Sequence, residues 1–75
     1  MNDVKECRIE AIERDWTVIR DRLNASGLDF IESPAYVKDG EQFKIFVWFD
    51  YSFDRIANLM KEIGGEYIED GRRVA

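Results

Sequence analysis

Residues 41–49 read Glu-Gln-Phe-Lys-Ile-Phe-Val-Trp-Phe, and this stretch decides the fold. Its aromatic and β-branched residues are typical of a β-strand, whose successive side chains point to opposite faces of a sheet. One set of alternate positions is apolar throughout: Phe43, Ile45, Val47 and Phe49. We expect this set to face a core covered by helices. Phe46 and Trp48 belong to the other set, and we expect them on the open face of the sheet.

A shorter strand is predicted just before this one. Residues 35–38 are followed by Asp39-Gly40, a dipeptide that suits a two-residue hairpin turn in which both residues have positive φ. A tight turn at this point pairs residues across the hairpin: Lys38 with Glu41, and Tyr36 with Phe43. Ser33-Pro34 is expected to interrupt the incoming strand, because proline has no backbone N–H to donate to a sheet.

Two segments of similar pattern lie 37 residues apart, and each predicts a helix. Asp15 and Ser52 occupy equivalent positions, where a short polar side chain can accept a hydrogen bond from the first turn of a helix. Apolar residues then recur at spacings of three and four, and Gly27 or Gly64 ends the helix. We therefore predict helices over residues 15–27 and 52–64, each followed by a strand, over residues 29–32 and 66–69.

Residues 4–14 fit two different structures. Apolar and charged residues alternate over residues 7–11, which favours a strand. The same apolar residues also extend the stripe of the first helix, which favours one long helix over residues 3–25. The strand gives the order βαββαβ, whereas the helix gives αββαβ with a three-stranded sheet. We favour the strand, because Asp15 suits the start of a helix better than its interior.

The order strand, helix, strand, strand, helix, strand resembles the ferredoxin-like plait. The resemblance covers nearly the whole chain and implies an α+β fold, in which an antiparallel sheet has both helices on one face. We predict a single domain over residues 1–75, with flexible ends at residues 1–5 and 71–75. Because this architecture carries enzymes, RNA binders, ligand sensors and adaptors, the fold alone does not identify a function.

The composition argues against several chemistries. The chain of 75 residues has 16 acids, 11 bases, one cysteine and no histidine, and its formal net charge is −5. Without histidine the usual nucleophile–base pairs and zinc sets cannot form, so we predict no enzymatic activity, no metal and no cofactor. Nucleic-acid binding is disfavoured because the bases are interleaved with acids. Residues 1–20 do not resemble a secretion signal and no stretch resembles a membrane span, so we expect a cytoplasmic protein.

The two aromatic residues expected on the open face need an explanation, because an exposed sheet face is usually polar. The register of the hairpin adds two residues and gives a predicted patch: Ala35, Val37, Phe46 and Trp48. Aromatic anchors ringed by charge are typical of protein interfaces. We therefore expect a non-enzymatic protein-binding module, acting as a regulator, adaptor or stoichiometric inhibitor. Its partner is expected to be another protein or a second copy of the chain.

Two alternative functions remain open. Small size, acidity and missing catalytic residues make the chain similar to phage-encoded anti-defence proteins, including anti-CRISPR and DNA-mimic inhibitors. The acidic surface of such an inhibitor would combine five carboxylates: Glu10, Glu13, Asp15, Asp50 and Asp54. Four of them lie where a strand leads into a helix, and we expect the plait to bring these four to one end of the sheet. The second alternative is a small-ligand-sensing regulatory domain, with a ligand at Gly27-Leu28 or Gly64-Gly65.

Overall fold

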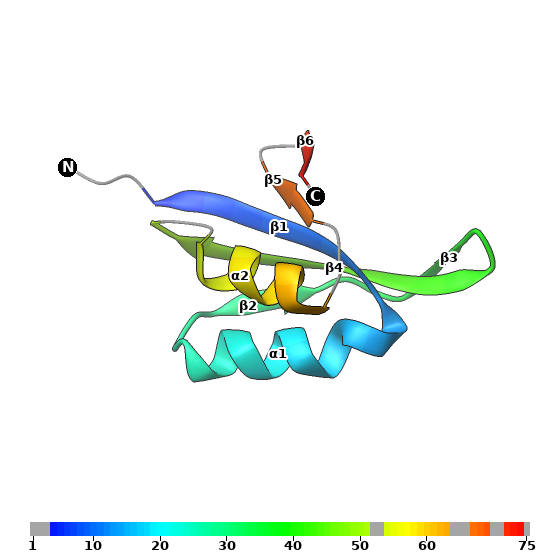
Figure 1. Ribbon diagram of the computed structural model, residues 1–75, viewed down its shortest axis with the longest axis horizontal. Coiled ribbons are helices and arrows are strands. Elements are labelled where there is room, and N and C mark those ends of the chain that lie inside the picture. The colour runs from blue at the N-terminus through cyan, green and yellow to red at the C-terminus, as the bar shows by residue number, and fades with distance from the viewer. Residues whose placement is uncertain (1–3, 52–53, 64–66, 70–71, 75) are drawn as a thin grey trace.

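The chain folds into a mixture of strands and helices that contains the elements expected from its sequence and one further strand at residues 72–74 (Figure 1). The computed structural model describes residues 4–51, 54–63, 67–69 and 72–74. The elements are β1 (Lys5–Ile12), a 3-10 turn η1 (Glu13–Asp15), α1 (Trp16–Ala25), β2 (Phe30–Glu32), β3 (Tyr36–Lys38), β4 (Glu41–Asp50), α2 (Asp54–Ile63), β5 (Tyr67–Glu69) and β6 (Arg72–Val74). The fold is α+β, as predicted.

Residues 5–12, whose sequence fits either a strand or the start of a long helix, form the strand β1. It pairs with β4 along its whole length, from Lys5 opposite Asp50 to Ile12 opposite Phe43. The predicted alternative of one helix over residues 3–25 is therefore wrong. The strand wins because β4 satisfies its backbone hydrogen bonds while alternation places its apolar side chains on one face. These buried side chains are Cys7, Ile9 and Ala11.

The strands form one sheet in the order β2-β4-β1-β5-β6, with β3 also paired to β4. Every pairing is antiparallel. Helices α1 and α2 pack against the same face of the β1–β4 pair and close one hydrophobic core (Figure 1). The buried cluster consists of Cys7, Ile9, Ala11, Ile19, Leu23, Phe46, Trp48, Ile56, Leu59 and Met60. Within the described part of the chain, no helix covers the opposite face of β4, which we call the open face.

The hairpin between β3 and β4 closes as predicted. Asp39 and Gly40 have φ values of 54° and 78°, so both central residues of the turn are left-handed. The predicted register is confirmed: Lys38 pairs with Glu41, and Tyr36 with Phe43. Figure 1 shows this hairpin extending beyond both helices.

The interruption expected at Pro34 separates β2 from β3 over residues 33–35. Ser33 maintains the connection to β4 across this gap. Its backbone N–H donates to the carbonyl of Ile45 at 2.9 Å, and its hydroxyl accepts from the N–H of Ile45 at 2.8 Å. A side-chain oxygen thus takes the place of a backbone carbonyl where the ladder of hydrogen bonds is broken.

Gly27 ends α1, as predicted. Its φ is 70°, and its N–H donates to the carbonyl of Asn24 at 3.0 Å. The next N–H, from Leu28, donates to the carbonyl of Leu23 at 3.1 Å. This pair of bonds is the Schellman motif, in which a left-handed residue satisfies the last carbonyls of a helix. The motif also turns Leu28 back against the core.

The predicted capping role of Asp15 is wrong. Its side chain makes no capping hydrogen bond, and its backbone has φ −102° and ψ −4°, outside the extended region that an N-cap normally adopts. The reason is that η1 leads directly into α1. The other predicted helix signals, Ser52, Gly64 and Gly65, lie outside the described residues, as do residues 1–3, 71 and 75 of the ends expected to be flexible.

Candidate functional site

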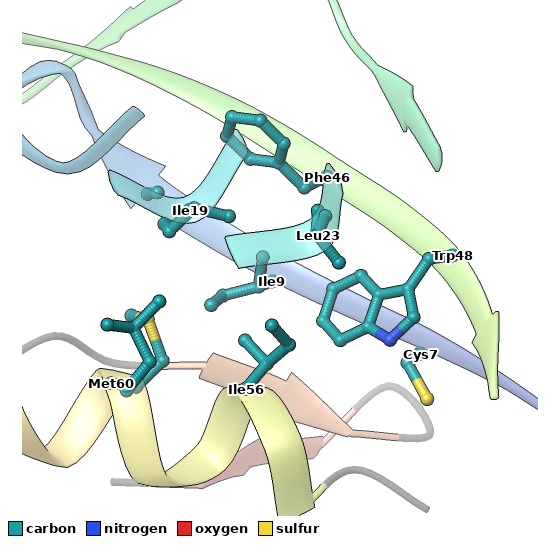
Figure 2. Close-up of a cluster of buried hydrophobic side chains, with 10 residues drawn as sticks. Cys7, Ile9, Ile19, Leu23, Phe46, Trp48, Ile56 and Met60 are labelled. Atoms are coloured by element: carbon teal, nitrogen blue, oxygen red, sulfur yellow. The ribbon is translucent and has the colours of Figure 1, made fainter. Parts of the chain in front are cut away.

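Phe46 and Trp48 lie in the core, so their predicted exposure is wrong. Both side chains are 0% exposed. Figure 2 shows the indole of Trp48 projecting from β4 toward Ile9 and Ile56, between the sheet and α2. The ring of Phe46 also contacts Phe30 of β2, with ring centroids 6.4 Å apart. Neither residue is available to a partner in the folded chain.

The register of β1 against β4 explains this reversal. Cys7 lies opposite Trp48, so apolar residues of both strands share the face that the helices cover. The set that we expected in the core lies instead opposite charged residues of β1: Ile45 opposite Glu10, Val47 opposite Arg8, and Phe49 opposite Glu6. Burying that set under the helices would also bury three ionised side chains, which costs more free energy than exposing apolar ones.

The open face consequently carries an apolar stripe along β2 and β4. We call it the open-face stripe, and it consists of Ile31, Ile45, Val47 and Phe49. Ile31 is 69% exposed and Phe49 is 57% exposed, whereas the other two are half-buried. Ile31 lies opposite Val47, so the two strands contribute to one continuous surface. Sequence reasoning grouped the three residues of β4 correctly, assigned them to the wrong face, and missed Ile31.

Ion pairs flank the open-face stripe on its β1 side. Arg8 donates to Glu6 at 2.9 Å, with both side chains about half exposed. Glu10 accepts from the ammonium of Lys38 at 2.6 Å and from the hydroxyl of Tyr36. The Lys38 ammonium also lies 4.8 Å from the ring centroid of Phe43. The contacts of Glu10 tie the hairpin to β1, and the two carboxylates of β1 on this face, Glu6 and Glu10, are both paired within the chain.

Val37 and Ala35, the other residues of the predicted patch, are exposed, Val37 at 72%. Val37 lies opposite Gln42, so it points away from the face that carries Tyr36 and Phe43. The structure therefore divides the predicted patch: two of its members are core residues, Val37 lies on the hairpin and points away from the open-face stripe, and Ala35 lies in the connection before β3.

The predicted acidic surface is not assembled either. Asp15 is 4% exposed and accepts two hydrogen bonds from the guanidinium of Arg14, at 2.8 and 3.1 Å. Asp50 is 7% exposed, and its carboxylate accepts from the N–H of Tyr51 at 2.8 Å. Glu10 is engaged on the open face, as described above. Glu13 and Asp54 are exposed, but they lie beyond opposite ends of the paired strands β1 and β4.

Glu32 forms an ionic cluster on the helix side of the sheet. Arg20 of α1 donates to it through two nitrogens, at 2.5 and 3.0 Å, and the ammonium of Lys44 lies 3.1 Å away. The Arg20 hydrogen bond is the main reason that the pKa of Glu32 falls from 4.5 to about 2, with desolvation opposing it and Lys44 adding to it. Lys44 also lies 4.8 Å from the Trp16 ring centroid. The cluster joins α1 to β2 and β4, which is a structural role.

A shallow depression of about 330 Å³ lies between the hairpin turn and η1. Its lining is Ile12, Glu13, Arg14, Gly40, Glu41 and Gln42. The one base in this lining, Arg14, is already engaged by Asp15 and by the carbonyl of Ile63 at 3.1 Å. Among the described residues, no group of three or more Cys, Asp or Glu side chains is placed to hold a metal ion.

Comparison of the chain with protein-family models, curated proteins and solved structures finds no match. Over the residues that the structure describes, no helix combines the length and the apolar character needed to cross a bilayer. The open-face stripe is therefore the candidate site, on the strength of its geometry.

Proposed function

We propose that this chain is a non-enzymatic protein-binding module that acts through the open-face stripe. Such a module serves as a regulator, adaptor or stoichiometric inhibitor of the protein that it binds. We also propose that its scaffold is a ferredoxin-like plait. The antiparallel strand order β2-β4-β1-β5 and the single core shared by α1 and α2 support that assignment. In such a scaffold the sheet face away from the helices is free to bind.

The exposure of Ile31 and Phe49 carries the proposal. Both are large apolar side chains, both are more than half exposed, and both lie on the same face as the half-buried Val47. An uncovered sheet face is normally polar, and a contiguous exposed apolar patch is typical of an interaction site. The ion pairs on the β1 side of the stripe would form one part of the polar rim that usually borders the apolar centre of a protein interface.

A thiol-protection experiment tests this proposal and does not require the partner to be identified first. Ile31→Cys places a reactive thiol in the open-face stripe, while the native Cys7 is only 2% exposed and should react slowly. Val18→Cys is the matched control, because Val18 is 43% exposed on α1, away from the sheet. Maleimide labelling is measured for each variant at high protein concentration, and at low concentration with and without lysate of the cells that make the protein.

We expect high protein concentration, added lysate, or both to slow the maleimide labelling of the Ile31→Cys thiol. The labelling of the Val18→Cys thiol should be the same in every condition. Protection that depends on concentration or on lysate protein shows that the open face is covered by association. If neither condition slows the labelling of the Ile31→Cys thiol relative to that of Val18→Cys, the proposed function is contradicted.

A further inference from the structure

We infer that Asp39, at the tip of the β3–β4 hairpin, is a site of spontaneous conversion to isoaspartate, and that the closed hairpin holds this reaction back. Asp39 and Gly40 form the two-residue turn, and both are exposed. Glycine has no side chain to crowd its own nitrogen, and a Cβ built at Gly40 meets no other atom within 4 Å. The carboxyl group of Asp39 and the nitrogen of Gly40 can therefore meet once the backbone of the turn permits it.

The reaction needs only the chain and water. The backbone nitrogen of Gly40 attacks Cγ of Asp39, and the new N–Cγ bond closes a succinimide ring. One carboxyl oxygen leaves as water, with the proton of the nitrogen and one from the carboxyl group or the solvent. Water then adds to one of the ring carbonyls. Addition at Cγ restores aspartate, whereas addition at the α-carbonyl breaks its bond to nitrogen and leaves the chain running through Cβ and Cγ. The water lost in the first step is regained in the second, so the mass is unchanged and no oxidant takes part.

The closed turn keeps the reacting atoms apart. With φ values of 54° and 78° the turn is of type I′, in which the first central residue has a ψ of about 30°. At that ψ the torsion from Cβ to the Gly40 nitrogen about the Cα–C bond is roughly 150°, so the two atoms lie on opposite sides of the bond. Ring closure requires them on the same side. The backbone of Asp39 must therefore rotate out of the turn, which ends the adjacent pairing of Lys38 with Glu41.

Glu10 of β1 resists this opening. Its carboxylate accepts hydrogen bonds from the ammonium of Lys38, at 2.6 Å, and from the hydroxyl of Tyr36, and its side chain is only 16% exposed. The stacked rings of Tyr36 and Phe43, with centroids 6.2 Å apart, add a contact within the hairpin. Figure 1 shows the hairpin reaching beyond both helices, so helix packing does not hold its tip. The rate of conversion at Asp39 should thus depend on Glu10, although Glu10 takes no part in the reaction.

Conversion would weaken the hairpin that restrained it. Isoaspartate adds one atom to the backbone of the turn, and the geometry of a two-residue turn sets the register of its hairpin. The pairing of β3 with β4 and the contacts of Tyr36 and Lys38 with Glu10 would then be lost together. The modification would therefore release the hairpin from β1.

The test follows isoaspartate at residue 39 during long incubation of the purified chain at mildly acidic pH. Peptide mapping with electron-transfer fragmentation separates Asp39 from Asp70, the other aspartate that precedes a glycine. We expect conversion in the folded chain to be at least roughly tenfold slower than in guanidinium chloride, because only the opened hairpin reacts. Glu10→Gln should raise the rate in the folded chain roughly fivefold or more, since two hydrogen bonds lose their charged acceptor. The matched control Glu6→Gln should leave it unchanged, because Glu6 lies on the same face of β1 but pairs with Arg8.

Four outcomes would overturn the inference. Equal rates in the folded chain and in guanidinium chloride would show that the turn does not protect Asp39. No isoaspartate at residue 39 in either condition would show that it is not a site. Equal rates for Glu10→Gln and Glu6→Gln, with circular dichroism confirming that both fold, would remove the role of Glu10. The isolated isoaspartate form should exchange the amide hydrogens of residues 36–43 faster than the unmodified chain, and equal exchange would refute the release of the hairpin.

Discussion

Adjacent residues of β4 should respond very differently to truncation, because Trp48 is 0% exposed and Phe49 is 57% exposed. Replacing a fully buried Phe or Trp by Ala costs about 3–5 kcal/mol. Phe49→Ala removes a side chain that is less than half buried, so about 1 kcal/mol is expected from its apolar area. The whole chain is stable by only about 4–11 kcal/mol, at roughly 0.05–0.15 kcal/mol per residue. Trp48→Ala should therefore lower the melting temperature by at least about 12 °C.

The comparison is made by urea and thermal unfolding followed by far-UV circular dichroism, because removing Trp48 changes the fluorescence signal itself. A protein concentration of about 1 µM minimises any stability contributed by association through the open face. If Trp48→Ala does not fold, Trp48→Phe gives a smaller loss that can still be ranked against Phe49→Ala. A loss for Phe49→Ala equal to or greater than that for Trp48→Ala would refute the assignment of faces on β4.

Three further predictions follow from other parts of the structure. Glu32→Gln should lower stability at pH 7 by about 1–2 kcal/mol. Since the pKa of Glu32 is about 2 in the folded chain against an ordinary 4.5, the wild-type advantage is complete above pH 4.5 and is lost as the pH falls toward 2. Melting curves of the two proteins should therefore converge at low pH, and a constant gap would contradict the ionic cluster. Gly40→Ala should cost about 1–2 kcal/mol in urea unfolding through its φ of 78° alone, because an added Cβ meets nothing within 4 Å. Trp16→Phe leaves Trp48 as the single tryptophan, whose emission should be blue-shifted and resistant to acrylamide; emission typical of exposed indole would disprove its burial.

Local signals in the sequence predicted most of the elements. Asp39-Gly40 determined the hairpin and its register, because few residue pairs accept positive φ at both positions. Gly27 marked the end of α1 for the same conformational reason. Pro34 marked the gap between β2 and β3. The start of α1 was harder to predict, because the backbone at Asp15 depends on the 3-10 turn before it and not on the capping preference of its side chain.

The sequence of β4 alone does not show which of its two sets of side chains faces the helices. The set of Phe43 and Ile45 is apolar from Phe43 to Phe49 and has its one charged member, Glu41, at the start of the strand, whereas the core-facing set contains Lys44 and Asp50, which disguises it. Those two polar residues sit at the edges of the core, where Lys44 reaches Glu32. The missing signal lay in β1, whose alternation places charge on one face and apolar side chains on the other. A helix-covered face must be apolar on both neighbouring strands, and pairing β1 with β4 on that basis selects Phe46 and its companions for the core.

The predicted acidic surface fails for a topological reason that also bears on function. β1 and β4 are antiparallel neighbours, so the ends at which α1 and α2 begin lie at opposite ends of the pair. Over the eight residues of β1, they are separated by about 27 Å at roughly 3.4 Å per residue. Carboxylates at these two junctions therefore cannot form one surface. The net charge of the chain is instead spread over the molecule and acts only through its summed long-range field. A binding surface in this fold must instead come from a face, where neighbouring strands place side chains about 5 Å apart. Of the two faces of the sheet, the helices fill one, and the open-face stripe occupies the other.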